Sequence, residues 1–192
     1  MKPFVMMLLG ISLIAAPVLA QSNLVVSAFT GYSMSAFEDQ ESAAGTLPLG
    51  ITVGHPVNSS LEVGGELNYA LGGYNFESNV SGGKLTTTFN QLVVGAFGKY
   101  HFQNSSKYAP YAKAGLGFFT GDAQMEFEYN GQKQKSDSNI DSGVGFSLGA
   151  GIKVNKNVFT EFNYNIVSRK PDGGNSFGMN TWGILVGWTF GQ

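Results

Sequence analysis

The sequence has little or none of several residue types on which whole classes of protein depend. It contains no cysteine, so neither disulfide bonds nor thiol chemistry supports its fold or its function. Charged residues make up only 12% of the chain, compared with about 25% in an average soluble domain. The formal net charge is −2, which is not the basic surface of a nucleic-acid-binding protein, so we expect no nucleic-acid partner. After residue 20, no apolar run approaches the ~20 residues that a membrane-spanning helix needs.

The N-terminal segment has the composition of a secretory signal peptide. Lys2 supplies a positive charge, an apolar stretch follows, and the small residue Ala20 ends the segment. The apolar stretch is short for a membrane-spanning helix, although a retained N-terminal anchor is the alternative. We therefore expect a signal peptide at residues 1–20, cleavage between Ala20 and Gln21, and a single domain over residues 21–192.

Glycine is abundant, at 27 residues, and it alternates with apolar residues along extended segments. From Gly143 to Val154 every second residue is apolar, and the residues between are glycine, serine or lysine. Because successive side chains of a strand point to opposite faces, this pattern predicts strands with one apolar face. Eight such segments follow one another, and the connections between them alternate in length. The short connections lie near Asn58, Gln103 and Asn155, and the long ones around residues 34–45, 73–86, 121–141 and 168–178.

These features predict an all-β fold: an eight-stranded antiparallel up-and-down transmembrane β-barrel with short periplasmic turns and long extracellular loops. A soluble barrel would instead put the apolar face inside and expose a surface of glycines, which are poor strand formers. If the glycine face lines the interior, it leaves room for large side chains such as Phe97, Tyr111 and Phe159. The apolar face then contacts lipid. Aromatic residues near its strand ends suit the girdles at the two membrane interfaces: Tyr69, Tyr100, Phe102, Trp182, Trp188 and Phe190.

Charged side chains on the predicted inner face are balanced. A charge enclosed without a partner is costly, whereas paired and hydrogen-bonded charges are tolerated. The balance therefore favours a paired network, in which we expect Glu66 to lie within salt-bridge reach of Lys99 or Lys113. A lumen open to water that tolerates single charges is the alternative. The predicted network consists of Glu62, Glu66 and Glu161 with Lys99, Lys113 and Lys153.

The long segment around residues 121–141 contains a hairpin signal of its own. Asn130-Gly131, flanked by alternating residues, is typical of a two-residue β-turn. A turn there pairs Tyr129 with Gln132, and two glutamates with two lysines farther along. This register does not match that of the membrane-spanning parts, where even-numbered residues face lipid on both strands. We therefore expect a protruding hairpin and a β-bulge, either at 120–122 or within 136–142.

At this point the sequence resembles the small eight-stranded outer-membrane barrels of Gram-negative bacteria, the OmpA, OmpX and OmpW-like superfamily. The stretch YAPYAKAGLGFF is similar to the fifth strand of that family. The end of the chain resembles its carboxy-terminal assembly signal, carried here by Gly183, Val186, Trp188 and Phe190. The resemblance implies the bacterial outer membrane as location, with outer-membrane lipids, lipopolysaccharide and the barrel assembly machinery as partners. It implies no cofactor.

Some barrels of that superfamily modify lipid A, which would require a histidine, a serine and a carboxylate near the outer leaflet. The only histidines, His55 and His101, fall next to short turns and hence at the periplasmic rim. We expect His55 to lie at the membrane interface and His101 to join the polar lumen. No catalytic, cofactor-binding or metal-binding residue is predicted.

Two loop segments carry charges whose role the sequence leaves open. Glu38, Asp39 and Glu41 could hold divalent cations that bridge lipopolysaccharide, or could form a solvated acidic loop without the spacing of a calcium loop. Arg169 and Lys170 could contact lipopolysaccharide phosphates. The leading hypothesis is a structural or surface-interaction barrel with a filled, charge-paired lumen. The alternatives are a narrow porin-like channel or carrier for small solutes and, third, a lipid A-modifying enzyme. The extracellular partner is unknown.

Overall fold

The computed structural model describes residues 23–37, 44–80, 82–169 and 177–190. The predicted cleavage site at Ala20 and Gln21, the acidic residues Glu38, Asp39 and Glu41, and Lys170 lie outside these residues. Within the described residues, no helix has the length and apolar character needed to span a bilayer. The strands are β1 (Val25–Phe37), β2 (Ala44–Pro56), β3 (Leu61–Leu71), β4 (Tyr74–Val80), β5 (Gly83–Phe89), β6 (Leu92–His101), β7 (Ala109–Tyr129), β8 (Gln132–Lys153), β9 (Val158–Arg169) and β10 (Phe177–Phe190).

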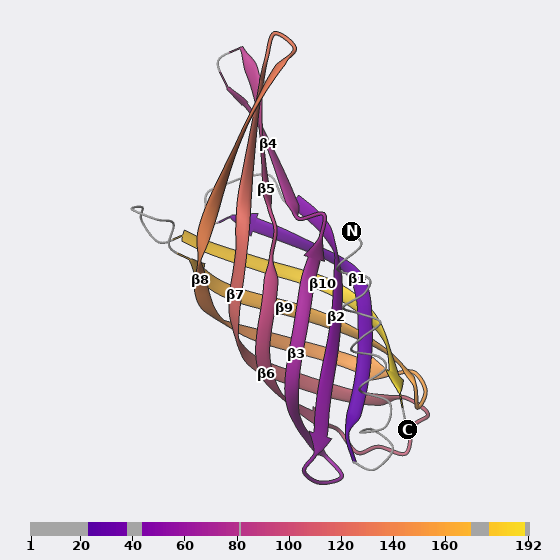
Figure 1. The fold of residues 1–192 in the computed structure, drawn as a ribbon. Helices are drawn as coiled ribbons and strands as arrows, with labels where there is room; N and C mark the ends of the chain where they lie inside the picture. Colours follow the sequence, from indigo (N-terminus) through magenta and orange to yellow (C-terminus); the bar gives the residue numbers. More distant parts are fainter. Residues whose placement is uncertain (1–22, 38–43, 81, 170–176, 191–192) are drawn as a thin grey trace.

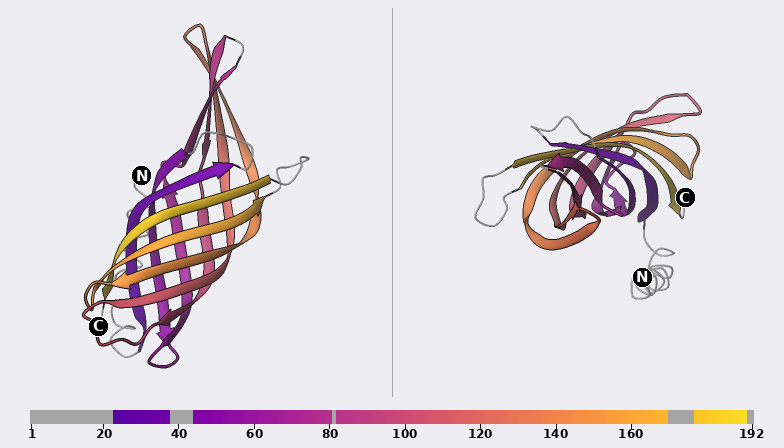
Figure 2. Two further views of the ribbon diagram at one scale, coloured as in Figure 1. Left: turned by 180° about the vertical axis from the view of Figure 1, so that it is seen from behind. Right: turned by 90° about the horizontal axis from the view of Figure 1, so that it is seen from above.

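Eight of these strands close into an antiparallel ring. Going round the ring, the order is β1, β2, β3, β6, β7, β8, β9, β10 and back to β1, and every neighbouring pair is hydrogen-bonded. Figure 1 and Figure 2 show the tilted strands wrapping around a common axis, with the short turns gathered at one end. The predicted eight-stranded up-and-down barrel is confirmed.

The long connection predicted at 73–86 joins the ring strands β3 and β6, but its internal structure was not predicted. This segment forms a second hairpin, β4 and β5, in which Gly82 turns the chain at a φ of +84°. β5 then pairs with the distal part of β7, from Gly83↔Tyr129 to Phe89↔Ala123. Within the described residues the barrel therefore carries a four-stranded sheet, β4-β5-β7-β8, that projects beyond one end of the ring (Figure 1).

The hairpin predicted for the segment after Thr120 is confirmed. Tyr129 faces Gln132 across the turn, Glu128 faces Lys133 and Glu126 faces Lys135. Asn130 and Gly131 have φ values of +49° and +76°, as a turn with two left-handed central residues requires. The predicted irregularity is also present, because the register shifts between Phe119 and Gly121. At the bulge, a side chain on Gly121 would collide with the carbonyl of Asn90, so only glycine permits this close approach.

The barrel is apolar outside and polar inside, as the alternation predicts. On β8, Leu148 is 53% exposed and Phe146 is 60% exposed, while on the neighbouring strand Lys113 is only 5% exposed. The outer face of β10 carries Trp182, Trp188 and Phe190 in exposed positions. Exposure of large apolar side chains to water would be unfavourable over such an area, whereas lipid is their natural solvent.

Glycines on the inner face make room for aromatic rings from other strands. A side chain on Gly151 would collide with the Tyr111 ring, and one on Gly187 with the Phe159 ring. These rings form a buried cluster with Phe29 and Leu185 in the lumen. The interior is thus filled by side chains, which fits a ring of eight strands.

The three short turns are closed by asparagine side chains. Asn58 Oδ1 accepts hydrogen bonds from the backbone N–H groups of Ser60 and Leu61, both at 2.9 Å. Asn155 accepts two equivalent bonds at 2.8 Å, and Asn104 accepts one at 3.1 Å. Asparagine satisfies backbone donors in tight turns in this way, which keeps these connections short and sets one end of the barrel.

Candidate functional site: the barrel lumen

The middle of the lumen is crossed by one lysine held between two carboxylates. Lys113 on β7 places its Nζ 2.7 Å from Glu66 Oε2 on β3 and 2.7 Å from Glu161 Oε1 on β9. Tyr111 donates a hydrogen bond of 2.9 Å from its hydroxyl to Glu161 Oε2. Glu66 therefore has one of its two predicted partners. Three strands that are not neighbours in the ring are joined across its interior by charge-assisted hydrogen bonds.

A second charged layer lies one step nearer the short turns. Glu62 Oε1 is 3.6 Å from Lys99 Nζ, and Glu62 Oε2 is 3.1 Å from His101 Nε2. The Lys99 ammonium also sits over the rings of Tyr111 and Phe97, at 5.0 and 5.3 Å from their centroids. Aromatic faces stabilise a cation at such distances, so the protein interior compensates this buried lysine in two ways.

Lys153 is the member of the predicted network without a close partner. It is half-buried, and it makes no ion pair within 4.0 Å among the described residues. The structure thus brings together Glu62 with Lys99, and Glu66 and Glu161 with Lys113. Lys153 interacts with Glu62 only at longer range.

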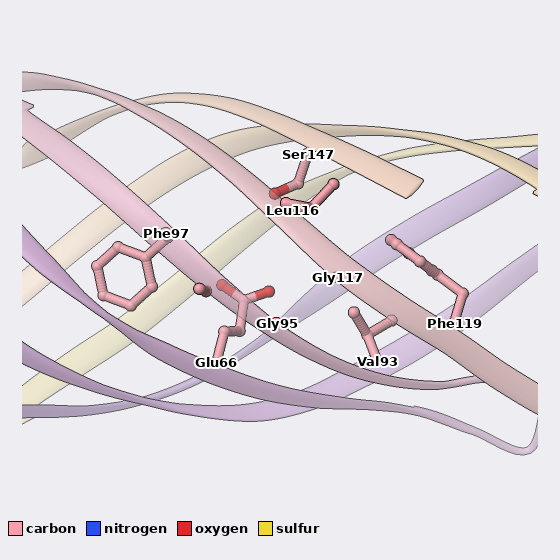
Figure 3. A pocket seen from close by; sticks show the side chains of 9 residues that line it. Glu66, Val93, Gly95, Phe97, Leu116, Gly117, Phe119 and Ser147 are labelled. Atoms are coloured by element: carbon pink, nitrogen blue, oxygen red, sulfur yellow. The ribbon is translucent and has the colours of Figure 1, made fainter. Parts of the chain in front are cut away.

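The cavities beside these layers are small. Figure 3 shows one of about 10 Å³, into which the Glu66 carboxylate points between Phe97 on one side and Val93 and Phe119 on the other. Such a volume accommodates about one water molecule. A second cavity of about 10 Å³ lies farther from the short turns, lined by residues that include Ser33, Asn68, Gln91 and Asn165.

This uncharged half of the lumen did not figure among the predicted site residues. Ser33 Oγ is 3.1 Å from Tyr74 Oη, and Asn165 donates a 2.9 Å hydrogen bond to Thr181. The same alternation that placed the charges also places Asn68 and Asn165 on the inner face. Neutral amides and hydroxyls, unlike charged groups, give no sequence signal for a lumen site.

The two histidines differ in their surroundings. His55 is exposed near the end of β2, and His101 contacts Glu62 and the Tyr111 ring, whose centroid is 5.8 Å from its own. Among the described residues, no serine hydroxyl is hydrogen-bonded to either histidine. The same residues contain no group of three or more histidine, cysteine, aspartate or glutamate side chains placed to hold a metal ion.

The last strand presents most of its predicted assembly signal to the outside. Val186, Trp188 and Phe190 are exposed on the lipid-facing side of β10, at 52%, 49% and 48%. Gly183 lies on the opposite, inner face, where a side chain would meet the backbone of Tyr32 and Ser33 on β1. This glycine therefore allows the first and last strands to close the ring.

A comparison with protein families matches residues 6–190 to the outer membrane protein beta-barrel domain. The chain belongs to this family. As a member, it is a protein of the bacterial outer membrane. A comparison with curated protein sequences finds no match.

Solved structures support the same fold at low sequence identity. Neisserial surface protein A (NspA) is 19% identical with a TM-score of 0.55, and the match covers 88% of this chain and 96% of that one. Ail, the attachment invasion locus protein of Yersinia pestis, is 16% identical with a TM-score of 0.53, covering 88% of this chain and 100% of that one. At this identity the similarity concerns the barrel itself.

Proposed function

We propose that this family member is a closed barrel that anchors an extracellular β-sheet in the outer membrane, with a structural or surface-interaction role and without catalytic activity. The layer of Lys113, Glu66 and Glu161 is the observation that supports a closed barrel. It spans the lumen and is almost completely buried, with side-chain exposures of 3%, 12% and 2%. Breaking a buried ion pair costs free energy, because the remaining charge has no partner. This layer therefore acts as a permanent plug in the lumen.

The second part of the proposal concerns the projecting sheet. β7 and β8 contain 21 and 22 residues, whereas a tilted strand crosses a bilayer with about 9–11. Roughly half of each strand is therefore available outside the membrane, where β7 pairs with β5, which in turn pairs with β4. Closing the ring does not require so long an ordered extension, which favours a role for it outside the membrane.

We also propose how the protein reaches the outer membrane. The chain is exported with a signal peptide that is cleaved between Ala20 and Gln21. Val186, Trp188 and Phe190, together with Gly183, then serve as the signal that the barrel assembly machinery recognises. Once assembled, the exposed apolar band contacts outer-membrane lipids and, on the outer side, lipopolysaccharide.

Planar bilayer recording tests the closed lumen directly. Purified protein inserted into a bilayer should give no steady current and no regular conductance steps. The variant Lys113→Ala, which shortens the plug, should give openings under the same voltage. A large stable current from the unaltered protein would instead support a channel or carrier. Mass spectrometry of lipid A from cells with and without the protein tests the enzymatic alternative, since a mass change would contradict the non-catalytic role.

A further inference from the structure

The uncharged half of the lumen contains two oxygen atoms that lack the hydrogen-bond partners expected of buried polar groups. Asn68 Oδ1 and Gln91 Oε1 are both inaccessible to solvent and accept no hydrogen bond from the protein. Gln91 as a whole is only 4% exposed. Both residues line the same cavity of about 10 Å³. Because burying an acceptor without a partner costs free energy, two such atoms at one cavity point to an occupant.

The neighbouring hydroxyl groups do not satisfy these oxygens. Ser33 Oγ donates to the carbonyl of Trp182 at 3.2 Å and lies 3.1 Å from the Tyr74 hydroxyl. Neither hydroxyl group is hydrogen-bonded to Asn68 Oδ1 or Gln91 Oε1. An occupant of the cavity must either donate hydrogen bonds to the amide oxygens or carry positive charge.

The position of Gln91 is fixed by contacts at the β-bulge. The adjacent Asn90 donates two hydrogen bonds of 2.9 Å to Asp122, one from its backbone N–H to the Asp122 carbonyl and one from its side-chain amide to the Asp122 carboxylate. The Gln91 carbonyl accepts a 2.9 Å hydrogen bond from the N–H of Ala70. The backbone at Gln91 is thus held from both sides, which fixes the position from which its side chain reaches the cavity.

Charge distribution decides between a neutral and a cationic occupant. The plug that borders this uncharged half carries excess acid, because Glu66 and Glu161 share the single ammonium of Lys113. Lys99 and Lys153 lie in the other layer, where they outnumber Glu62. Asn68 is two residues from Glu66 on β3, a separation of about 7 Å along the strand. In a low-dielectric interior this excess negative charge attracts a cation over such a distance.

We propose that the cavity between Asn68 and Gln91 is a binding site for a small monovalent cation, an alkali or ammonium ion. Neutral amide oxygens are suitable ligands for hard cations. The volume admits an ion of about the size of a water molecule and excludes organic cations with alkyl groups. The site lies on the outer side of the plug and is independent of whether the barrel conducts.

Thallium(I), which has the charge of an alkali ion and a strong anomalous signal, is the probe for this site. Crystals grown with thallium(I) acetate should show an anomalous peak in contact with both Asn68 Oδ1 and Gln91 Oε1. In the variant carrying Asn68→Leu and Gln91→Met, which retains side-chain volume, the peak should be lost. Asn163→Leu is the matched control, because this buried lumen amide does not line the cavity and its removal should leave the peak in place.

Thermal unfolding gives a second measurement in solution. The unaltered protein in detergent should unfold at a higher temperature in potassium chloride than in N-methylglucamine chloride of equal ionic strength, since ligands that bind the folded state stabilise it. The difference should vanish in the double variant and persist in Asn163→Leu. A water peak without anomalous signal in the unaltered protein would overturn the proposal, and this result does not depend on whether the variants fold. Equal unfolding temperatures in the two salts would overturn it as well.

Discussion

Among single residues, Lys113 is the one whose loss should affect stability most. Replacing it by methionine keeps most of its volume but leaves Glu66 and Glu161 buried beside each other without a counter-ion. Breaking a buried ion pair by removing one partner costs about 3–5 kcal/mol. We therefore expect Lys113→Met to lower the free energy of unfolding by roughly that amount, measured by urea denaturation of the protein in lipid vesicles.

Two controls separate this effect from a general loss of a lysine. Lys133→Met removes an ion-paired lysine from the exposed hairpin and should change the unfolding free energy far less, because water already solvates its partners. Adding Glu66→Gln and Glu161→Gln to Lys113→Met removes the uncompensated charge and should recover most of the lost stability. An equal loss from Lys113→Met and Lys133→Met would contradict the role of the buried plug.

Glu126, on the projecting hairpin, provides a prediction about pH. Hydrogen bonds from Lys133 at 2.6 Å and then from Lys135 lower the pKa of this carboxyl from 4.5 to about 2. Because its pKa is lower in the folded hairpin than in the unfolded chain, Glu126 stabilises the hairpin above pH 4.5. This contribution is lost as the pH falls toward 2.

Carboxyl titration by NMR measures this shift directly. Glu126 should titrate well below the ordinary glutamate range, and amide exchange at the hairpin tip should accelerate over the same pH interval. With Lys133→Gln and Lys135→Gln together, the midpoint should return to the ordinary glutamate value of 4.5. A midpoint that stays low without these lysines would show that they are not its cause.

Side-chain alternation predicted the faces of these residues but not all of their partners. A period of two assigns a residue to the inner or outer face, and this was sufficient for the lumen charges. It does not give the height of a residue relative to the neighbouring strand, which depends on interstrand register. Glu62 and Lys99 are directly opposite on β3 and β6, whereas Lys113 lies opposite Lys99 and reaches its carboxylates diagonally. The longer separation of Lys153 from its predicted partners has the same origin.

Among the elements, β8 gives the clearest test of which face meets lipid. Leu148 lies midway along the barrel part of this strand and points outward, so Leu148→Arg should impair folding into membranes by about 2–4 kcal/mol. Gly149→Ser, one residue away, adds a hydroxyl on the inner face near Glu161, where a Cβ would lie 3.1 Å from the carboxylate oxygen. This change should be milder, because a small side-chain adjustment relieves the contact. Folding yield into vesicles measures both, and equal damage would contradict the assigned alternation.

The hairpin of β7 and β8 was predictable, whereas that of β4 and β5 was not. Asn130-Gly131 is a strong local signal, and a register conflict within one pair of strands predicted a bulge at 120–122 or within 136–142, of which the structure has the first. The β4–β5 segment has an equally regular alternation, from Tyr74 to Val80, but a weaker turn. Its stability depends on a partner some 40 residues later in the chain, the distal part of β7. Single-sequence patterns contain no information about that non-local pairing.

In the whole molecule, the ring and the projecting sheet are structurally separable. The pairs that close the ring on either side of β7 lie between Ala109 and Thr120. The pairs that attach β5 lie between Ala123 and Tyr129 of the same strand. The bulge separates the two sets. Removing the distal part of β7 and β8 should therefore leave the ring able to form, while β4 and β5 lose the edge on which they rest.

A shortened protein tests this division. Deleting 124–129 and 132–137 lets the native Asn130-Gly131 turn join Ala123 to Ser138, which already face each other, so the pairing pattern is preserved. We expect the compact, heat-sensitive band of a folded barrel on unheated SDS gels. Trypsin should then cut after Lys84, which the full-length protein holds between β4 and β7. Cleavage after Lys107, exposed in a short turn at the opposite end, should be the same in both proteins and serves as the internal control.

Loss of the compact band would mean that the sheet is needed for the ring to close. Protection of Lys84 in the shortened protein would mean that β4 and β5 are stable without β7, and either result would contradict the proposed separation.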